Sequence, residues 1–409
     1  MISDFRLLAT GQTLSWIGNG FQTVALAVAI FGAGGGAGDL GTVMACSFAT
    51  LLACSLFGGV WADRLQPQRV MVVSDLIRLL AAAAMAVMFA GGGYHLPLLC
   101  ALVAVSSGAG SFFNPAMTAL RPLLVPADRL QSANATLSML QTGSSVAGPA
   151  IGGLIVAAFG APAGFAVNAA SFLASMAACL LLRTRATRGP RSPMLHELRA
   201  GWREVSSRDW LIGGLFSATV YHIANGVILV LVQMIAVQRL GGAPAAGFIA
   251  AAEGLGGVIG AAVALRWKPR RLLRAGWLTL MLMPIWAFAY VWPATLVAVL
   301  AGAVIGWAGL IFFDVAWETA IQDQVPRAAL GRVASWDTLT SFLAMPIGNA
   351  LAGPLSARFG VHPVLTVCAG ILLASAVSQL LIPGVRTLTR ADATPPAHTP
   401  PELVEAAAA

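Results

Sequence analysis

Charged side chains are scarce in this sequence: they make up 10% of the 409 residues, whereas hydrophobic residues make up 58%. Soluble domains carry about 25% charged residues, and a soluble fold of this length has no means of hiding so much apolar surface. Lipid must therefore be the solvent for much of the chain. The net charge of +8 does not indicate a nucleic-acid partner, because the basic residues lie in short clusters between long apolar runs.

The sequence also lacks the usual marks of enzymes and metal proteins. No pair of cysteines forms a CxxC motif, so we predict neither a zinc site nor a disulfide. The single lysine, Lys268, follows Trp267 and belongs to no phosphate-binding GxxxxGK[ST] loop. The five histidines are scattered singly. We therefore predict no catalytic residue, no metal, no cofactor and no ATP-driven machinery, which argues against a membrane enzyme.

Long apolar runs dominate the chain. A spanning helix needs about 20 mainly apolar residues, and the first run, residues 7–31, is too long for a cleavable signal peptide. We predict an all-α polytopic membrane protein with twelve transmembrane helices. The expected spans are 5–31, 40–62, 69–91, 95–118, 133–158, 162–182, 210–237, 244–265, 272–292, 294–317, 335–357 and 361–383.

The connections between these runs alternate in charge. Arginine is abundant in the connections that follow the even-numbered spans, from the second to the twelfth. The other connections are rich in glycine and small residues, and only Arg239 and Arg358 break the pattern. Basic loops remain on the cytoplasmic side. We therefore place both termini in the cytoplasm of a bacterium, with the chain in its inner membrane, and an even number of spans requires the same side for both.

An internal repeat runs through the chain at an offset of 200 residues. Phe112-Phe113 recurs as Phe312-Phe313, Gly148 as Gly348, and Phe159-Gly160 as Phe359-Gly360. Two six-helix halves in the same orientation imply a pseudo-two-fold axis along the membrane normal, with the binding site between the halves near the midplane. We assign residues 1–182 and 210–383 to the halves and 384–409 to a disordered tail.

The remaining segment, 183–209, links the two halves. Leu195, Leu198, Trp202 and Val205 are spaced by three, four and three residues, which makes one apolar helical stripe. Either a helix lying on the cytoplasmic membrane interface or a plain linker helix fits this spacing.

A few polar residues interrupt the apolar spans, where ionisable groups are costly unless they are paired or hydrated. Glu253 stands about nine residues into its span, roughly 14 Å deep, with no cation one turn away. We predict that it carries protons, with Asp314 as the second candidate; the alternative is a hydrogen bond to another helix. Five further polar residues occupy the first span of each half: Asn19, Gln22, Tyr221, His222 and Asn225. They either face a central cavity or bond between helices.

The connection after the second span reads Gly59-Val-Trp-Ala-Asp63-Arg64-Leu-Gln-Pro-Gln-Arg69. This resembles the loop signature of the major facilitator superfamily, although Pro67 and Gln68 replace basic residues of that pattern. The resemblance implies a cytoplasmic gate that Asp63 helps to hold shut, and a carboxylate at a helix N-terminus is worth about 0.3–1 kcal/mol. Asp75 and Arg78, one turn apart in the next span, are expected to form an ion pair near this gate.

The fifth span contains Gly148-Pro149-Ala-Ile-Gly152-Gly153, which resembles the antiporter signature of exporters in that superfamily. Gly148 and Gly152 form a GxxxG pair that allows two helices to approach closely; generic tight packing is the alternative. Residues 112–135 and 74–78 resemble the branch of macrolide-efflux and enterobactin-exporter-type permeases. That branch often has Asp where this chain has Asn19.

The resemblance implies a monomeric secondary transporter that exports a small, largely apolar organic compound, such as a drug, antibiotic or siderophore, in exchange for protons. Two alternatives stay open. One is a proton-coupled symporter that imports a small metabolite; the other is a transport-inactive membrane sensor or assembly partner, which a large extra soluble domain would favour.

Overall fold

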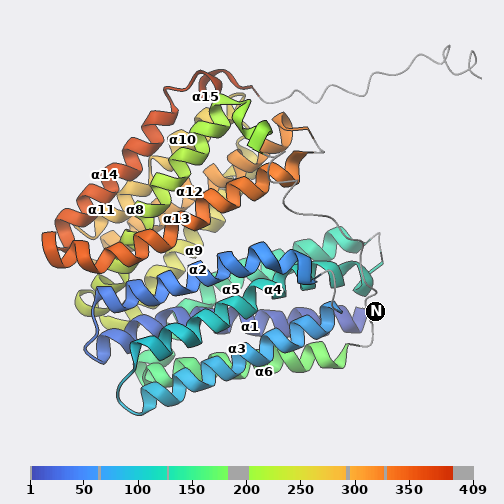
Figure 1. The fold of residues 1–409 in the computed structure, drawn as a ribbon, viewed down its shortest axis with the longest axis vertical. Coiled ribbons are helices and arrows are strands. Elements are labelled where there is room, and N and C mark those ends of the chain that lie inside the picture. The colour runs from blue at the N-terminus through green and yellow to red at the C-terminus, as the bar shows by residue number, and fades with distance from the viewer. Residues whose placement is uncertain are drawn as a thin grey trace, which may run out of the picture.

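The computed structural model describes residues 2–62, 66–126, 129–182, 202–291, 295–326 and 329–389. Throughout these ranges the regular structure is helical (Figure 1). The first half contains α1 (Ile2–Gly32), α2 (Ala37–Ala62), α3 (Pro67–Ala90), α4 (Leu96–Leu124), α5 (Leu130–Phe159) and α6 (Ala161–Leu181). The second half contains α8 (Asp209–Arg239), α9 (Gly242–Arg266), α10 (Leu272–Leu280), α11 (Met283–Ala289), α12 (Leu296–Gln324), α13 (Leu330–Phe359), α14 (Val361–Gln379) and α15 (Pro383–Thr387).

The described helices match the predicted spans. Eleven spans are long and apolar enough to cross a membrane, with α10 and α11 together forming one of them. The remaining helix, α13, is more polar and contains Pro346 and Pro354, but its 30 residues equal the length of α5. The prediction of an all-α polytopic fold with two six-helix halves is confirmed.

The ninth predicted span differs from the expectation, because it is broken into α10 and α11 rather than continuous. Pro284 stands in the first turn of α11, and proline has no amide hydrogen to continue the helical ladder. The chain passes the break through turn-like bonds, from the Leu282 amide to the Thr279 carbonyl and from the Ile285 amide to the Leu282 carbonyl. Proline thus sets the break at Met281–Leu282.

The internal repeat reappears as matched helix packing. In each half, a glycine near the middle of the fifth helix lies directly against the backbone of the first helix, so that a side chain there would overlap it. The matched contacts are Gly148 with Ile17 and Gly20 in the first half, and Gly348 with Ile223 and Gly226 in the second half. The two halves are therefore built on one packing scheme, as the 200-residue offset predicts.

The two halves meet at one end of the molecule and diverge toward the other (Figure 1). We call the end near the start of α1, where the arginine-rich connections lie, the arginine-rich end, and the opposite one the arginine-poor end. At the arginine-poor end Gly38 of α2 faces Gly353 of α13, and Gly153 of α5 faces Gly247 of α9. Because glycine has no side chain, these helices touch backbone to backbone. The space between the halves is closed at that end.

The linker and the tail are only partly described. Leu195 and Leu198 lie outside the described residues, as does most of segment 183–209. Residues 202–206 are helical, with Val205 buried and the Trp202 ring 4.9 Å from that of Trp336 in α13.

The expectation of disorder from residue 384 onward is wrong for the first residues of the tail. Helix α15 is ordered there because Val385 is buried and the Gly384 amide donates to Asp209 Oδ2 at 3.1 Å. Residues 390–409 lie outside the described part of the chain.

Candidate functional site

A cavity of about 530 Å³ lies between the two halves, within the size range of small-molecule sites. Helices α1 to α4 form one wall, and α8, α9 and α12 form the other. Most of the lining is apolar, with Leu, Met, Val, Ala, Phe and Trp side chains. The polar side chains in the lining are Asn19, Gln22, Thr23, Ser47, Arg78, Ser106, Ser107, Gln233 and Glu253.

Of the five predicted cavity residues, the two from the first half line the cavity and the three from the second half do not. Asn19 and Gln22 of α1 line the cavity, whereas Tyr221, His222 and Asn225 of α8 do not appear in its lining. Tyr221 and Asn225 are 5% and 6% exposed, and the His222 ring lies 2.7 Å from the Ala218 carbonyl within its own helix. Of the two alternatives left open for these residues, facing the cavity holds for Asn19 and Gln22 but not for the three residues of α8.

Gln233 is the polar residue that α8 supplies instead. It follows Asn225 by eight residues, which is two turns plus about 80° around the helix axis, so it faces a different neighbour. The face next to Asn225 is occupied by α13, because Gly226 lies against Met345 and Asn349. The predicted cavity residues do not include Gln233, Ser47, Ser106 or Ser107. A glutamine within the apolar run 227–237 is a signal in the sequence for the position of Gln233 at the cavity.

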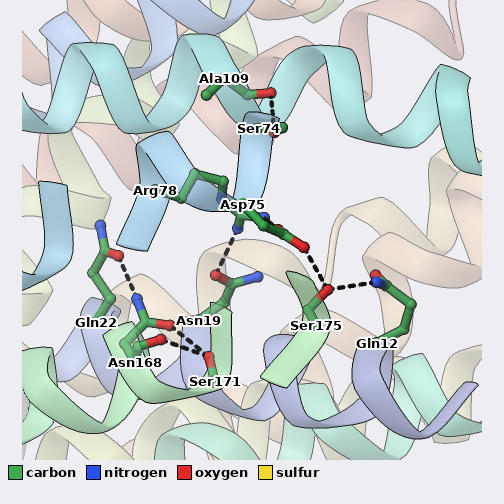
Figure 2. A network of polar contacts seen from close by, with 10 residues as sticks. All are labelled: Gln12, Asn19, Gln22, Ser74, Asp75, Arg78, Ala109, Asn168, Ser171 and Ser175. Carbon is green, nitrogen blue, oxygen red and sulfur yellow. Dashed lines mark hydrogen bonds and ion pairs between the residues drawn. The ribbon is translucent and has the colours of Figure 1, made fainter. Parts of the chain in front are cut away.

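Arg78 of α3 is the cation in the cavity lining, and several groups fix its position (Figure 2). Its Nη2 donates to Asn19 Oδ1 at 2.9 Å, and its Nη1 lies 3.6 Å from Asp75 Oδ1. The guanidinium carbon stands 4.0 Å from the centroid of the Phe172 ring, a distance typical of a cation–π contact. Arg78 is thus held by α1, α3 and α6 while part of it faces the cavity.

A second layer of hydrogen bonds holds Asp75 in turn. Its side chain is fully buried, and Asp75 Oδ2 accepts a hydrogen bond from the Ser175 hydroxyl at 2.6 Å. Gln12 of α1 donates to the same Ser175 oxygen at 2.9 Å (Figure 2). A buried charge needs such partners to be tolerated. This chain of contacts links α1, α3 and α6 behind the cavity wall.

Gln22 is positioned separately from Arg78. Its Oε1 accepts a hydrogen bond from Asn168 Nδ2 of α6 at 2.6 Å, and Ser171 donates to the Asn168 carbonyl at 2.7 Å (Figure 2). Asn19 and Gln22 therefore both have fixed partners behind the cavity wall.

Glu253 of α9 lines the opposite wall and is half-buried. It lies within electrostatic range of Trp286 and Tyr290, and Trp307 lines the same cavity. No described cation forms an ion pair with it. A carboxyl group on the second half and a guanidinium group on the first half therefore face one cavity from two walls.

Asp314, the second predicted proton carrier, lies elsewhere. It is absent from the cavity lining and stands 18 residues into α12, about 27 Å along that helix. Its electrostatic neighbours are the carboxylates of Glu318 and Asp337 and the hydroxyl of Tyr221. Trp317 Nε1 donates to Asp337 Oδ1 at 2.9 Å. These acidic residues form a separate group nearer the arginine-rich end.

The predicted gate residues are only partly described. Asp63 and Arg64 lie outside the described residues, Gly59 is described as part of α2 by its backbone alone, and Arg69 is exposed in the first turn of α3. The ion pair expected of Asp75 and Arg78 is present. The two residues stand eight and eleven positions into α3, with Arg78 in the cavity lining and Asp75 buried behind it.

The helix-five motif has two contact surfaces. Gly152 lies against Phe21 of α1, whereas Gly153 lies against Ala243 and Gly247 of α9, and the Pro149 carbonyl also approaches Gly247. The motif therefore packs on its own half with one face and on the opposite half with the other. It forms part of the seal at the arginine-poor end.

Among the described residues, no three His, Cys, Asp or Glu side chains are grouped so that they could hold a metal ion.

Comparisons with known proteins show which family and which relatives this chain resembles. The model of the Major Facilitator Superfamily matches residues 8–349. The multidrug efflux pump Tap of Mycolicibacterium fortuitum is 28% identical over 387 residues, covering 91% of this chain and 93% of that protein. The putative bacilysin exporter BacE of Bacillus subtilis (strain 168) is 24% identical over 326 residues, covering 78% and 80%.

Solved structures show the same fold at low sequence identity. A mutant of the peptide transporter POT gives a TM-score of 0.75 at 15% identity, covering 94% of this chain and 95% of that one. A mutant of the nucleoside transporter NupG gives 0.74 at 12% identity, covering 93% and 99%.

Proposed function

Because this chain belongs to the major facilitator superfamily, we propose that it is a monomeric proton antiporter that exports a small organic compound from a bacterium. It is a multi-pass transporter of small molecules and not an enzyme. The export direction is supported by the relatives, since Tap is named as an efflux pump and BacE as a putative exporter.

The observation that carries the proposal is the cavity with Arg78 and Glu253 in opposite walls. A mostly apolar lining binds the body of an organic compound by burying its surface, and the polar side chains orient it. We infer a substrate that is largely apolar and has at least one hydrogen-bonding group. Asn19, Gln22, Gln233 and Trp307 line the same space and complete the proposed site.

The proposed orientation puts the arginine-rich end in the cytoplasm, as basic connections favour. With this orientation, the seal at the arginine-poor end supports a state that takes up substrate from inside. Rocking of the two halves around the cavity would expose it to the other side. The helix-five glycines are the contacts that must separate during this movement, and we propose that Asp63 and Arg69 help to close the opposite end.

Glu253 is the proposed proton carrier. An ionised carboxylate away from water is costly, so Glu253 favours the protonated form when the cavity is dry and releases the proton when water or a bound substrate enters. Its lack of an ion-pair partner among the described residues leaves it free to change charge. Asp314 is the weaker candidate because it does not line the cavity.

The decisive experiment is uphill transport by purified protein in liposomes with an imposed pH gradient. Glu253→Gln keeps the shape and hydrogen bonding of the side chain but cannot titrate. We expect it to abolish concentrative transport while substrate binding and downhill exchange remain. The matched control is Glu204→Gln, which removes a carboxylate that pairs with Arg208 outside the spans. Concentrative transport by Glu253→Gln would show that Glu253 is structural and move the search to Asp314.

The orientation has its own test. Single cysteines at Gly35, Gly92 and Ala161, with the native cysteines removed, should react with an impermeant reagent from outside the cell. Cysteines at Gln66, Ser192 and Thr389 should react only after the cytoplasmic side is opened. One position on the wrong side would overturn the proposed topology.

A further inference from the structure

A second hollow lies on the outer surface of the second half, between α8, α13 and α14. Its volume is about 460 Å³, and every residue that lines it is apolar. Phe359 and Val367, two of the lining residues, are 57% and 62% exposed. In a membrane these side chains face lipid. We call this hollow the α14 groove.

The α14 groove begins at the arginine-poor end and runs toward the middle of the membrane. On α14 its lining extends from Pro363 to Ile371, a separation of eight residues or about 12 Å. Half of the hydrocarbon core of a bilayer is about 15 Å thick. The groove therefore has the depth of one leaflet, which suits the acyl chain of a lipid rather than a compact ligand.

The mouth of the α14 groove is basic. Arg358 adjoins the lining residue Phe359, and its guanidinium carbon stands 5.4 Å from the centroid of that ring. His362 adjoins Pro363, and its Nε2 lies 3.2 Å from Arg239 Nη1 of α8. Arg239 and Arg358 are the two residues that break the alternation of basic connections in the sequence.

These two arginines have no acidic partner in the described part of the chain. The one carboxylate described at this end belongs to Asp39, and it is already engaged, since Asp39 Oδ2 accepts from the Gly36 amide at 2.9 Å and from the Tyr94 hydroxyl at 3.0 Å. Two exposed cations thus stand beside an apolar groove. The complementary molecule has a long hydrocarbon chain and an anionic head.

We propose that the α14 groove binds an anionic phospholipid, with one acyl chain in the groove and the phosphate between Arg239 and Arg358. Arginine suits this role because its fork of N–H donors matches phosphate oxygens. The bound lipid would connect the arginine-poor ends of α8 and α13. The proposed lipid site does not depend on the identity of the transported substrate. The orientation proposed above places the arginine-poor end, and therefore the groove, in the outer leaflet, and only this assignment depends on it.

The test uses phosphatidylglycerol and phosphatidylcholine that carry a photoreactive diazirine in the acyl chain. The full-length protein is reconstituted in nanodiscs with a trace of one probe, irradiated, and digested for peptide mass spectrometry. We expect labelling within 220–227 and 363–371 to favour phosphatidylglycerol, by about fivefold for each arginine near the head group. The double variant Arg239→Gln/Arg358→Gln should label equally with both probes.

Three controls keep the result specific. Arg239→Lys/Arg358→Lys retains both charges and should retain most of the preference. Arg266→Gln/Arg274→Gln removes two arginines at the opposite end and should leave it unchanged. Val367→Trp fills the groove and should lower labelling by both probes at 363–371. Equal labelling of the parent by both lipids, or a preference that survives in Arg239→Gln/Arg358→Gln, would overturn the proposal.

Discussion

The two halves of the molecule share one helix-packing scheme but differ in how many of their buried polar groups are hydrogen-bonded. In the first half, Arg78, Asp75 and Gln22 each have named partners. In the second half, many of the described buried polar atoms make no hydrogen bond of ordinary geometry. Ten of the twelve described buried side-chain nitrogen and oxygen atoms without a hydrogen bond lie in this half. One of the other two, Asp75 Oδ1, stands 3.6 Å from Arg78 Nη1 and is therefore ion-paired.

This difference suggests a division of work between the halves. A fully bonded network is rigid, so the first half presents a fixed wall to the cavity. Trp286, Tyr290 and Trp307, which lie near Glu253 or line its cavity, have polar atoms that make no hydrogen bond of ordinary geometry with the described residues. Such groups can change partners without breaking existing bonds. The second half is therefore where a proton and a substrate can alter the interactions.

The largest expected effect comes from breaking the buried pair of the first half. Asp75→Leu leaves the Arg78 guanidinium without its carboxylate, and removing one partner of a buried pair costs about 3–5 kcal/mol. Thermal unfolding in detergent should show a large loss of stability. The double variant Asp75→Leu/Arg78→Met removes both charges and should recover most of the loss. No recovery would mean that the pair is not the source of rigidity.

The second prediction concerns the seal between the halves. Gly153→Val places a side chain against the Ala243 carbonyl and the Gly247 Cα, so it should hold the arginine-poor end open and reduce transport by tenfold or more, about 1.4 kcal/mol. Labelling of Ser47→Cys in the cavity should shift toward reagent added at that end. Gly143→Val is the matched control in the same helix, because Gly143 has open space around it. Equal behaviour of the two variants would contradict the seal.

The third prediction compares the contributions to stability of two buried asparagines, one from each half. Asn168→Leu removes the donor to Gln22 and should cost about 1–3 kcal/mol, because a buried polar group is left unpaired. Asn349 is fully buried, and neither side-chain atom has a partner among the described residues. Asn349→Leu should therefore change stability little or increase it. Chemical unfolding of both variants measures this difference in stability. Equal losses of stability in the two variants would contradict the prediction.

The smallest expected effect is on the ionisation of Tyr94. Burial, together with the hydrogen bond to the Asp39 carboxylate, raises the pKa of Tyr94 to about 12 from 10.0. The folded state therefore favours the protonated phenol, so this stabilising contribution is complete below about pH 10 and is lost as the pH rises toward 12. Absorbance titration at alkaline pH should show Tyr94 ionising late. Asp39→Asn should shift its ionisation to lower pH, and Tyr94→Phe should remove the signal.

The sequence predicted the fold far better than it predicted the site. Helix boundaries follow from the length of the apolar runs and from proline and glycine, and the packing of Gly148 and Gly348 follows from the repeat. What the apolar runs do not encode is rotation about the helix axis, because both lipid and the protein interior favour apolar residues. Asn19 and Asn225 occupy matching places in the repeat. Yet Asn19 lines the cavity, and Asn225 is buried outside its lining.

Arg78 illustrates the same limit. Its spacing from Asp75 predicts an ion pair, which the structure contains. Its position at the cavity depends on Asn19 and Phe172, which belong to other helices and are far away in the sequence. Glu253 could be found from the sequence because an acidic residue deep in an apolar run is costly in lipid and usually faces a cavity or the bundle interior.

The seal at the arginine-poor end consists of glycine backbones, and this has a consequence for the surroundings in which the protein can work. Ion pairs between the halves would weaken as the salt concentration rises, since dissolved ions screen exposed charges. Contacts of Gly38 with Gly353 and of Gly153 with Gly247 carry no charge and act through short-range dispersion. The seal itself should therefore be equally strong in dilute and in saline media.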